Sequence, residues 1–293
     1  MANISAQDVK TLREKTGAGM MECKNALVEC EGDFAKAEKL LKEKGLAAVE
    51  KRADRATKEG KASVKIKDDG SMAVIVELVT ETDFVARNPE FIALGYTIAD
   101  KVLEKNLDEK DAAPDSKFYE EMGGLVTDLA TKIRENMSLK RIKVIRASAG
   151  EYLSSYIHGD GAIGVVVKLA ADKPETLQKP EFTELAHNLA LHVAWANPAA
   201  LDREKIDPAY IKENEDIFRK QMETDESLKG KPEKVLEGIL NGKVSKLLKS
   251  ICMMDQAYIK DEKQTVSQIL KETGKTLGAT ISVTDYVYLK VGV

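Results

Sequence analysis

The sequence predicts an α+β protein made of three parts: an N-terminal unit of three helices, a core of two related strand-turn-strand-helix halves, and a protruding helical hairpin. Three observations predict this class. The spacing of apolar residues is helical up to about residue 45 and alternating after Lys61. The segment 69–103 is repeated 91 residues further along the chain. A polar stretch with helical spacing follows Leu201.

Residues 1–45 carry start and stop signals for three short helices. Ser5 is a favoured N-cap, and Asp8 follows three residues later as a variant of the capping box. Asp33 can cap a third helix that ends at Gly45. Because so small a unit buries little surface, we expect its stability to be modest.

Each half of the core is expected to begin with two strands joined by a tight turn. Val64 and Ile66 alternate with lysines, Asp69-Gly70 forms a turn, and the apolar run 72–79 returns as a buried strand. The later run EYLSSYIH, its Gly-Asp-Gly turn and AIGVVVKLA repeat this pattern. Both pairs of strands precede a helix that begins with Pro-Glu-Phe.

The internal repeat separates a shared scaffold from a segment that only one half contains. Eleven residues are identical between 69–103 and 160–194 without a gap, including the turn and the Pro-Glu-Phe. None of the positions 79–88 matches its counterpart, and Phe84 is replaced by Glu175. A lone loop phenylalanine is often a core plug. The repeat favours the other reading, in which Phe84 serves a task of the first half alone.

The hairpin from 201 to 252 has few apolar residues, so it either pairs with a partner, including a second copy of the chain, through its narrow apolar seam or projects as a solvated arm. The sequence leaves both readings open. The predicted divisions are a three-helix domain at 1–45, a connector at 46–60, the first core half at 61–138, the second at 139–200, the hairpin at 201–252 and a return to the core at 253–293.

Composition narrows the class of protein. The chain of 293 residues is 32% charged with a net charge of −4, and only 5% of its residues are aromatic. This balance is unlike a nucleic-acid carrier, and aromatic platforms for single-stranded RNA are not expected. No membrane-length apolar run or signal-peptide pattern is present, and the three cysteines form no CxxC pair. We therefore expect a cytoplasmic protein with reduced thiols and no direct contact with membrane or nucleic acid.

The sequence lacks the usual signatures of catalysis. It has no Walker loop, no GxGxxG after a strand, no GxSxG and no HExxH. His187 and His192 are five residues apart on an expected helix, so they do not share a face for a metal. We expect no metal, no cofactor and no covalent catalysis. The pattern indicates a protein that acts by binding.

Two segments closely resemble the signature segments of the bacterial elongation factor Ts family, the guanine-nucleotide exchange factors of elongation factor Tu. They are LREKTGAGMMECKNAL and TETDFVARN. The order of elements is also similar: a ubiquitin-associated-like helical domain, a two-part core, a protruding hairpin and a return to the core. The resemblance extends from about residue 2 to about 290. Many members continue into a C-terminal helical module, whose contribution we expect to be absent or supplied differently here.

The resemblance implies an exchange wedge in the first half. Asp83 and Phe84, with Thr82 before them, match the residues that enter the partner's GTPase domain. Phe84 would enter an apolar slot between two helices there and displace elements beside the magnesium site and the phosphate-binding loop. Ile133, in the segment 132–136, matches an apolar contact beside the wedge.

The resemblance also implies two further contacts with the same partner. Leu12, Met20 and Met21 match the face of the N-terminal domain that meets the GTPase domain, and His158 matches a position that reaches the partner's third domain. Leu12 is read equally well as a core residue. Met20 and Met21 are adjacent on a helix, so only one of them can be fully buried within its own domain. The other is available for binding, and flexible methionine suits that use.

These assignments predict a factor that promotes GDP release from elongation factor Tu, stabilises its nucleotide-free state and so permits GTP reloading. GDP and Mg²⁺ would be weakened only indirectly. The alternative is an RNA- or ribosome-binding adaptor that uses the N-terminal helices and the basic connector. Residues 36–67 contain eleven basic and five acidic residues, most of them interspersed, which is also typical of a solvated helix.

Overall fold

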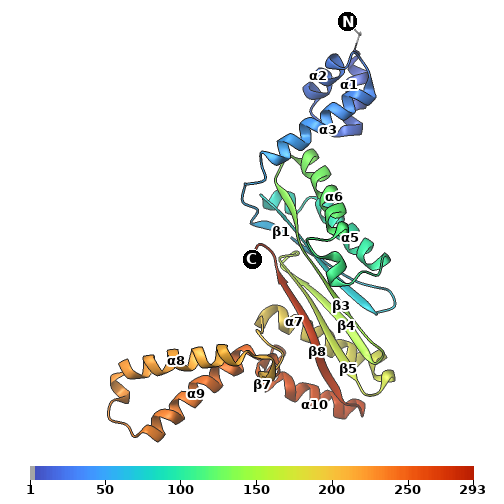
Figure 1. The fold of residues 1–293 in the computed structure, drawn as a ribbon. Helices are drawn as coiled ribbons and strands as arrows, with labels where there is room; N and C mark the ends of the chain where they lie inside the picture. The colour runs from blue at the N-terminus through green and yellow to red at the C-terminus, as the bar shows by residue number, and fades with distance from the viewer. Residues whose placement is uncertain (1–3) are drawn as a thin grey trace.

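The computed structural model describes residues 4–293 and shows an elongated molecule (Figure 1). Three helices lie at one end, a layered core of sheets and helices forms the middle, and a helical hairpin points away from the other end. The mixture of helices and small antiparallel sheets is that of an α+β protein.

The N-terminal module consists of three helices with a hydrophobic cluster of their own. Ser5 and Asp8 form the expected capping box, and Asp33 accepts a hydrogen bond from the amide of Lys36 at the start of the third helix. That helix does not end at Gly45 but continues to Glu50, since a glycine inside a helix is tolerated at modest cost. The helices are α1 (Ala6–Thr16), α2 (Met20–Glu29) and α3 (Phe34–Glu50).

The core contains two three-stranded antiparallel sheets with the orders β1-β2-β3 and β4-β5-β8. The central strand of each sheet has a register shift, after Glu77 in one and after Lys168 in the other. These positions are 91 residues apart, the offset of the sequence repeat. The strands are β1 (Glu59–Ile66), β2 (Met72–Thr80), β3 (Met137–Arg146), β4 (Glu151–His158), β5 (Ile163–Ala171) and β8 (Ile281–Lys290).

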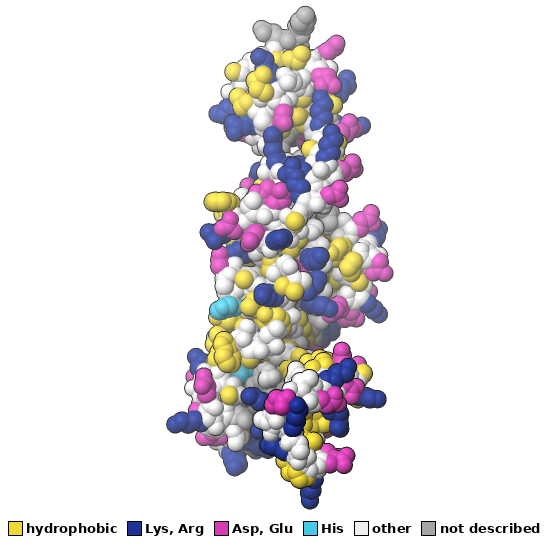
Figure 2. Space-filling view, turned by 90° about the vertical axis from the view of Figure 1, so that its left-hand side faces the viewer, with side chains coloured by type: hydrophobic (Ala, Val, Ile, Leu, Met, Phe, Trp, Pro, Cys, Tyr) yellow, Lys and Arg dark blue, Asp and Glu magenta, His cyan; other side chains and the backbone are white. Residues whose placement is uncertain are grey.

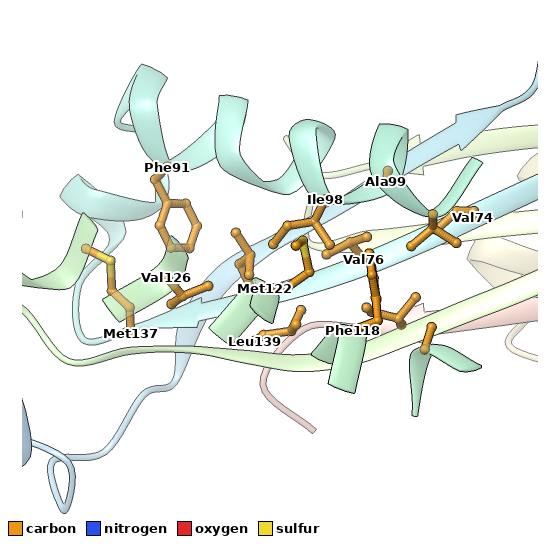
Figure 3. Close-up of a cluster of buried hydrophobic side chains, with 14 of the residues drawn as sticks. Val74, Val76, Phe91, Ile98, Ala99, Phe118, Met122, Val126, Met137 and Leu139 are labelled. Carbon is orange, nitrogen blue, oxygen red and sulfur yellow. The ribbon is translucent and has the colours of Figure 1, made fainter. Parts of the chain in front are cut away.

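The two sheets face each other, and helices cover their outer faces. Val64 and Ile75 of one sheet share a buried cluster with Val166 and Leu289 of the other. Phe91 and Phe182, equivalent in the repeat, lie fully buried under the outer helices. Figure 3 shows the first of these outer clusters, with side chains of two helices packed onto the strands. The covering helices are α5 (Pro89–Glu104), α6 (Lys117–Ile133), α7 (Pro180–Ala196) and α10 (Val266–Leu277).

The hairpin of α8 (Pro208–Thr224) and α9 (Glu233–Ile251) projects from the second half (Figure 1). Its apolar seam is partly open, with Ile217 and Val235 exposed. A small strand pair that the sequence did not predict, β6 (Ala257–Tyr258) with β7 (Asp261–Thr265), follows it. Short 3₁₀ turns lie at Glu109–Ala112, Pro174–Gln178, Arg203–Lys205, Glu226–Leu228 and Met253–Asp255. Within residues 4–293, no helix is long and apolar enough to span a bilayer.

His192 on α7 is fully buried, whereas His187 on the same helix is exposed. The Nε2 atom of His192 lies 3.0 Å from the side-chain oxygen of Gln256, and its Nδ1 atom has no hydrogen-bond partner. Burial lowers the pKa of His192 below its ordinary value of 6.5, while the bond to Gln256 acts in the opposite direction. The folded protein therefore holds this imidazole neutral where the unfolded chain would already be protonated.

We expect this histidine to make stability depend on pH in a defined window. Below about pH 6.5 the unfolded state binds a proton that the folded state does not, so the free energy of unfolding should fall as the pH falls towards the lowered pKa. Urea unfolding of the wild type between pH 7.5 and 5.5 should show this slope. His192→Leu should flatten it. The exposed His187→Leu should retain it, and an equal slope in both variants would contradict the assignment.

Candidate partner-binding site

Phe84 is 82% exposed, the largest exposed fraction among the large hydrophobic side chains of the described residues. It lies on α4 (Asp83–Ala86), a single helical turn between β2 and α5 that the sequence analysis treated as a loop. Thr82 caps this turn, since its hydroxyl accepts a hydrogen bond from the amide of Val85 at 3.4 Å. Val85 and Ala86 are buried, so the same turn that fixes them in the core directs Phe84 outwards.

The carboxylate of Glu135 fixes the start of this turn. Glu135 accepts hydrogen bonds from the hydroxyl of Thr82 at 2.7 Å, from its amide at 3.1 Å and from the hydroxyl of Thr80 at 3.1 Å. Hydrogen bonds to an ionised acceptor are stronger than neutral ones. Phe84 is therefore an exposed side chain on a firmly held backbone, which distinguishes it from an aromatic residue in a mobile loop.

Charged groups lie on α4 and between β1 and the turn of the second half that follows His158. Arg87 pairs with Asp83 at 3.2 Å. The ammonium of Lys61 lies 2.7 Å from the carboxylate of Asp160 and donates to its carbonyl oxygen at 2.5 Å. The hydrogen bond from Lys61 lowers the pKa of Asp160, and the charge of Arg87 acts in the same direction. The two halves thus present α4 and this turn close to each other.

His158 is exposed at the end of β4, two residues before Asp160. Its Nδ1 atom lies 3.2 Å from the hydroxyl of Tyr156, whose ring packs edge-on against His187. The amide of Ala62 donates to the carbonyl of Gly161 at 2.8 Å, which adds a backbone bond between the halves beside His158. Ile133 is half-buried and packs against the core cluster that includes Val85 of α4.

The N-terminal module presents methionines to solvent, but not Leu12. Met20 is 44% and Met21 is 65% exposed. Leu12 has no exposed surface and forms the centre of the module with Leu27 and Cys23. The free chain thus shows the core reading of Leu12 that the sequence left open, and contact of this residue with a partner stays a prediction.

The module docks on the C-terminal end of α6 through close contacts and surface ion pairs. A Cβ atom at Gly45 would approach Thr131 to 2.3 Å, so glycine allows the two helices to touch there. Arg134 pairs with Glu22, and Lys42 lies 3.7 Å from Asp128. Glu22 also caps α2, the helix that carries Met20 and Met21. Figure 2 shows the module as a separate lobe on the core.

The sequence analysis missed Lys61, Arg87, Glu135 and Asn136. A signal for the last two was present, since polar residues directly after an apolar helix and before an alternating strand must close a turn. Within residues 4–293, no cluster of three His, Cys, Asp or Glu side chains could hold a metal ion. What the structure brings together is an exposed aromatic side chain, charged residues and an exposed histidine on one stretch of surface. A rigid apolar projection of this kind is typical of proteins that act by binding another macromolecule.

Comparison with known proteins gives the family. Residues 81–293 match the family described as elongation factor Ts. The elongation factor Ts of Treponema denticola is 48% identical over 290 residues, which cover 99% of each chain. That of Desulfovibrio desulfuricans is 41% identical over 288 residues, which cover 98% of this chain and 97% of the relative. The chain belongs to the elongation factor Ts family, and its role lies in translation elongation.

Proposed function

We propose that the protein is a guanine-nucleotide exchange factor of elongation factor Tu, and that α4 is its exchange element. The observation that carries this proposal is Phe84, 82% exposed on a turn held by Glu135. In the complex, Phe84 enters an apolar slot of the GTPase domain, with Asp83 and Thr82 beside it. Ile133 packs next to the entry point.

Exchange of this kind needs no covalent chemistry. The factor binds the nucleotide-free partner more tightly than the nucleotide-bound one, and by linkage the nucleotide weakens factor binding by the same ratio. Mg²⁺ bridges the phosphates of the nucleotide to the GTPase, so displacing elements beside its ligands loosens GDP. GTP can then reload the empty site.

Two further contacts hold the partner while Phe84 acts. The exposed Met20 and Met21 provide a flexible apolar surface on one side of α4. The turn at His158, joined to the first half through Lys61 and Asp160, provides the other. The family assignment does not favour the alternative of an RNA- or ribosome-binding adaptor.

The test is release of a fluorescent GDP analogue from elongation factor Tu with magnesium present. Wild-type protein should accelerate release by orders of magnitude, in proportion to its concentration until saturation. No acceleration would reject the proposal. RNA binding with a steep salt dependence would then support the adaptor.

A further inference from the structure

Arg134, Glu135 and Asn136 contact three separate parts of the chain. We propose that they are positioning residues for nucleotide exchange, which hold α4, the connector after α3 and the N-terminal module in one fixed arrangement behind Phe84. The inference rests on the proposed function. It adds residues that act through their contacts within the chain, by determining how firmly the backbone of Phe84 is held.

Glu135 is the contact to α4. Both of its carboxylate oxygens are used, one by the hydroxyl of Thr82 and the other by the amide of Thr82 and the hydroxyl of Thr80. The bonds fix Thr80, the last residue of β2, and Thr82, the N-cap from which the helical turn of Phe84 starts. Removing the carboxylate would break these three bonds. The start of the turn would then depend on the bond from the backbone amide of Asn136 to Glu81 and on the hydrogen bonds that Thr82 accepts from Val85 and Ala86.

The flanking residues make the other two contacts. The side-chain amide of Asn136, which is buried, donates to the carbonyls of Ala53 at 3.0 Å and Arg55 at 2.8 Å in the connector. Arg134 pairs with Glu22, the residue that caps the helix of Met20 and Met21. These three consecutive residues therefore join α4, which carries Phe84, to the N-terminal module, which carries Met20 and Met21.

The internal repeat supplies a control within the same molecule. In each half a covering helix is followed by three residues and then by the third strand of the sheet: α6 leads to β3 and α10 leads to β8. The three residues are Arg134, Glu135 and Asn136 in the first half and Gly278, Ala279 and Thr280 in the second.

The backbone of the two turns is the same. The first residue is left-handed in both, with φ 71° and ψ 24° at Arg134 and φ 66° and ψ 32° at Gly278. In both turns the backbone amide of the third residue donates a hydrogen bond to an acidic side chain. Asn136 donates to Glu81 at 2.6 Å, and Thr280 donates to Asp172 at 2.8 Å. Glu81 and Asp172 are also equivalent in the repeat, 91 residues apart.

The side chains of the first-half turn are therefore not needed to close it. The second half makes the same turn with Gly-Ala-Thr, and glycine fits the left-handed position better than arginine does. The first half retains an arginine there, and it has a carboxylate where the second half has only Ala279. These extra groups occur in the half that contains Phe84, and they contact α4, the connector and the module.

Phe84 can act as a wedge only if the backbone that carries it is held rigidly. An aromatic side chain that enters a slot displaces the walls only if its own backbone yields less than they do. If the start of α4 can shift, entry of Phe84 moves the factor instead of the GTPase, and coupling between the two binding events is lost.

The test replaces residues of the first-half turn by those at the equivalent positions of the second-half turn. The triple variant Arg134→Gly, Glu135→Ala, Asn136→Thr keeps the amide bond to Glu81 and a turn sequence that already folds in this protein. Glu135→Ala isolates the contact to Thr80 and Thr82. Glu135→Gln keeps one acceptor oxygen for Thr82 and tests rescue. Thr280→Ala, a polar-to-alanine change in the equivalent turn, is the matched control.

The first readout needs no partner. Amide hydrogen exchange in a peptide covering 80–90 should become at least about tenfold faster in Glu135→Ala and in the triple variant, while a peptide within α5 stays protected. Thr280→Ala should leave both peptides unchanged. Faster exchange throughout the core, together with a lowered melting temperature, would show a general structural role and overturn the proposal. Unchanged protection at 80–90 would overturn it as well.

The second readout is GDP release from elongation factor Tu over a range of factor concentrations. The maximal rate should fall roughly ten- to hundredfold in Glu135→Ala, the range that loss of one or two charge-assisted hydrogen bonds corresponds to, and the half-saturating concentration should change much less. Glu135→Gln should recover part of the rate. Retention of the full maximal rate by the triple variant would overturn the proposal. Failure of the wild type to release GDP would reject the proposed function instead, and hydrogen exchange would still decide whether these residues position α4.

Discussion

Phe84→Ala should reduce the acceleration of GDP release from elongation factor Tu by about ten- to hundredfold. Burying a phenylalanine side chain contributes roughly 1.5–3 kcal/mol, and about 1.4 kcal/mol corresponds to one decade in an equilibrium constant. In the isolated protein this side chain is 82% exposed, so its removal forfeits almost no folding energy. The measurement is the rate of fluorescent GDP release at saturating factor, beside the melting temperature of each variant.

The matched control for Phe84→Ala is Tyr210→Ala on α8. Tyr210 is also an exposed aromatic residue, 42% exposed, but it lies on the hairpin far from α4 (Figure 1). Tyr210→Ala should leave both the rate of GDP release and the melting temperature unchanged. Equal rates for wild type and Phe84→Ala would mean that Phe84 is a bystander and that the other contacts displace the nucleotide.

Much of the fold was predictable because local signals coincide with the architecture. The turn at Asp69-Gly70, the Pro-Glu-Phe helix starts and the cap at Ser5 all lie where the structure has them. The repeat was informative since it compares two copies of one scaffold. A residue in a segment that only one copy contains is not needed to build the shared scaffold, and Phe84 was identified by that comparison.

Other features could not be decided from the sequence. Leu12 has helical spacing and apolar character, which fit both a core and a surface role, and only three-dimensional packing places it inside the module. Glu135 acts on Thr82 from more than fifty residues away, and no local pattern encodes that contact. The repeat at offset 91 does not align the third strands, so the equivalence of Arg134 and Gly278 became visible only when both turns were seen to join a helix to a strand.

Removal of residues 1–45 should lower exchange by at least about tenfold although Phe84 remains in place. The wedge alone supports only about one to two decades of coupling, and a tightly held nucleotide needs more. The cut spares Val49, which packs against the first-half core, and removes a module with a separate hydrophobic cluster. The core should therefore stay folded, as far-UV circular dichroism and thermal melting of the truncated chain can verify.

A finer variant separates lost anchoring from general damage. Met20→Ser with Met21→Ser changes two exposed side chains and leaves Leu12 and Leu27 in their cluster, so the module should remain folded. It should reproduce part of the loss seen on truncation. Full exchange by the truncated chain would show that the N-terminal module does not hold the partner.

Combining truncation with Phe84→Ala tests whether the wedge pushes against an anchor. If the contacts act independently, their effects on the logarithm of the exchange rate should add. If Phe84 displaces the GTPase elements only while the module holds the partner, removing Phe84 from the truncated chain should cost much less than removing it from the full chain. The pairing of Glu22 with Arg134, next to the residue that holds Thr82, favours the second outcome, because it places anchor and wedge on one continuous support.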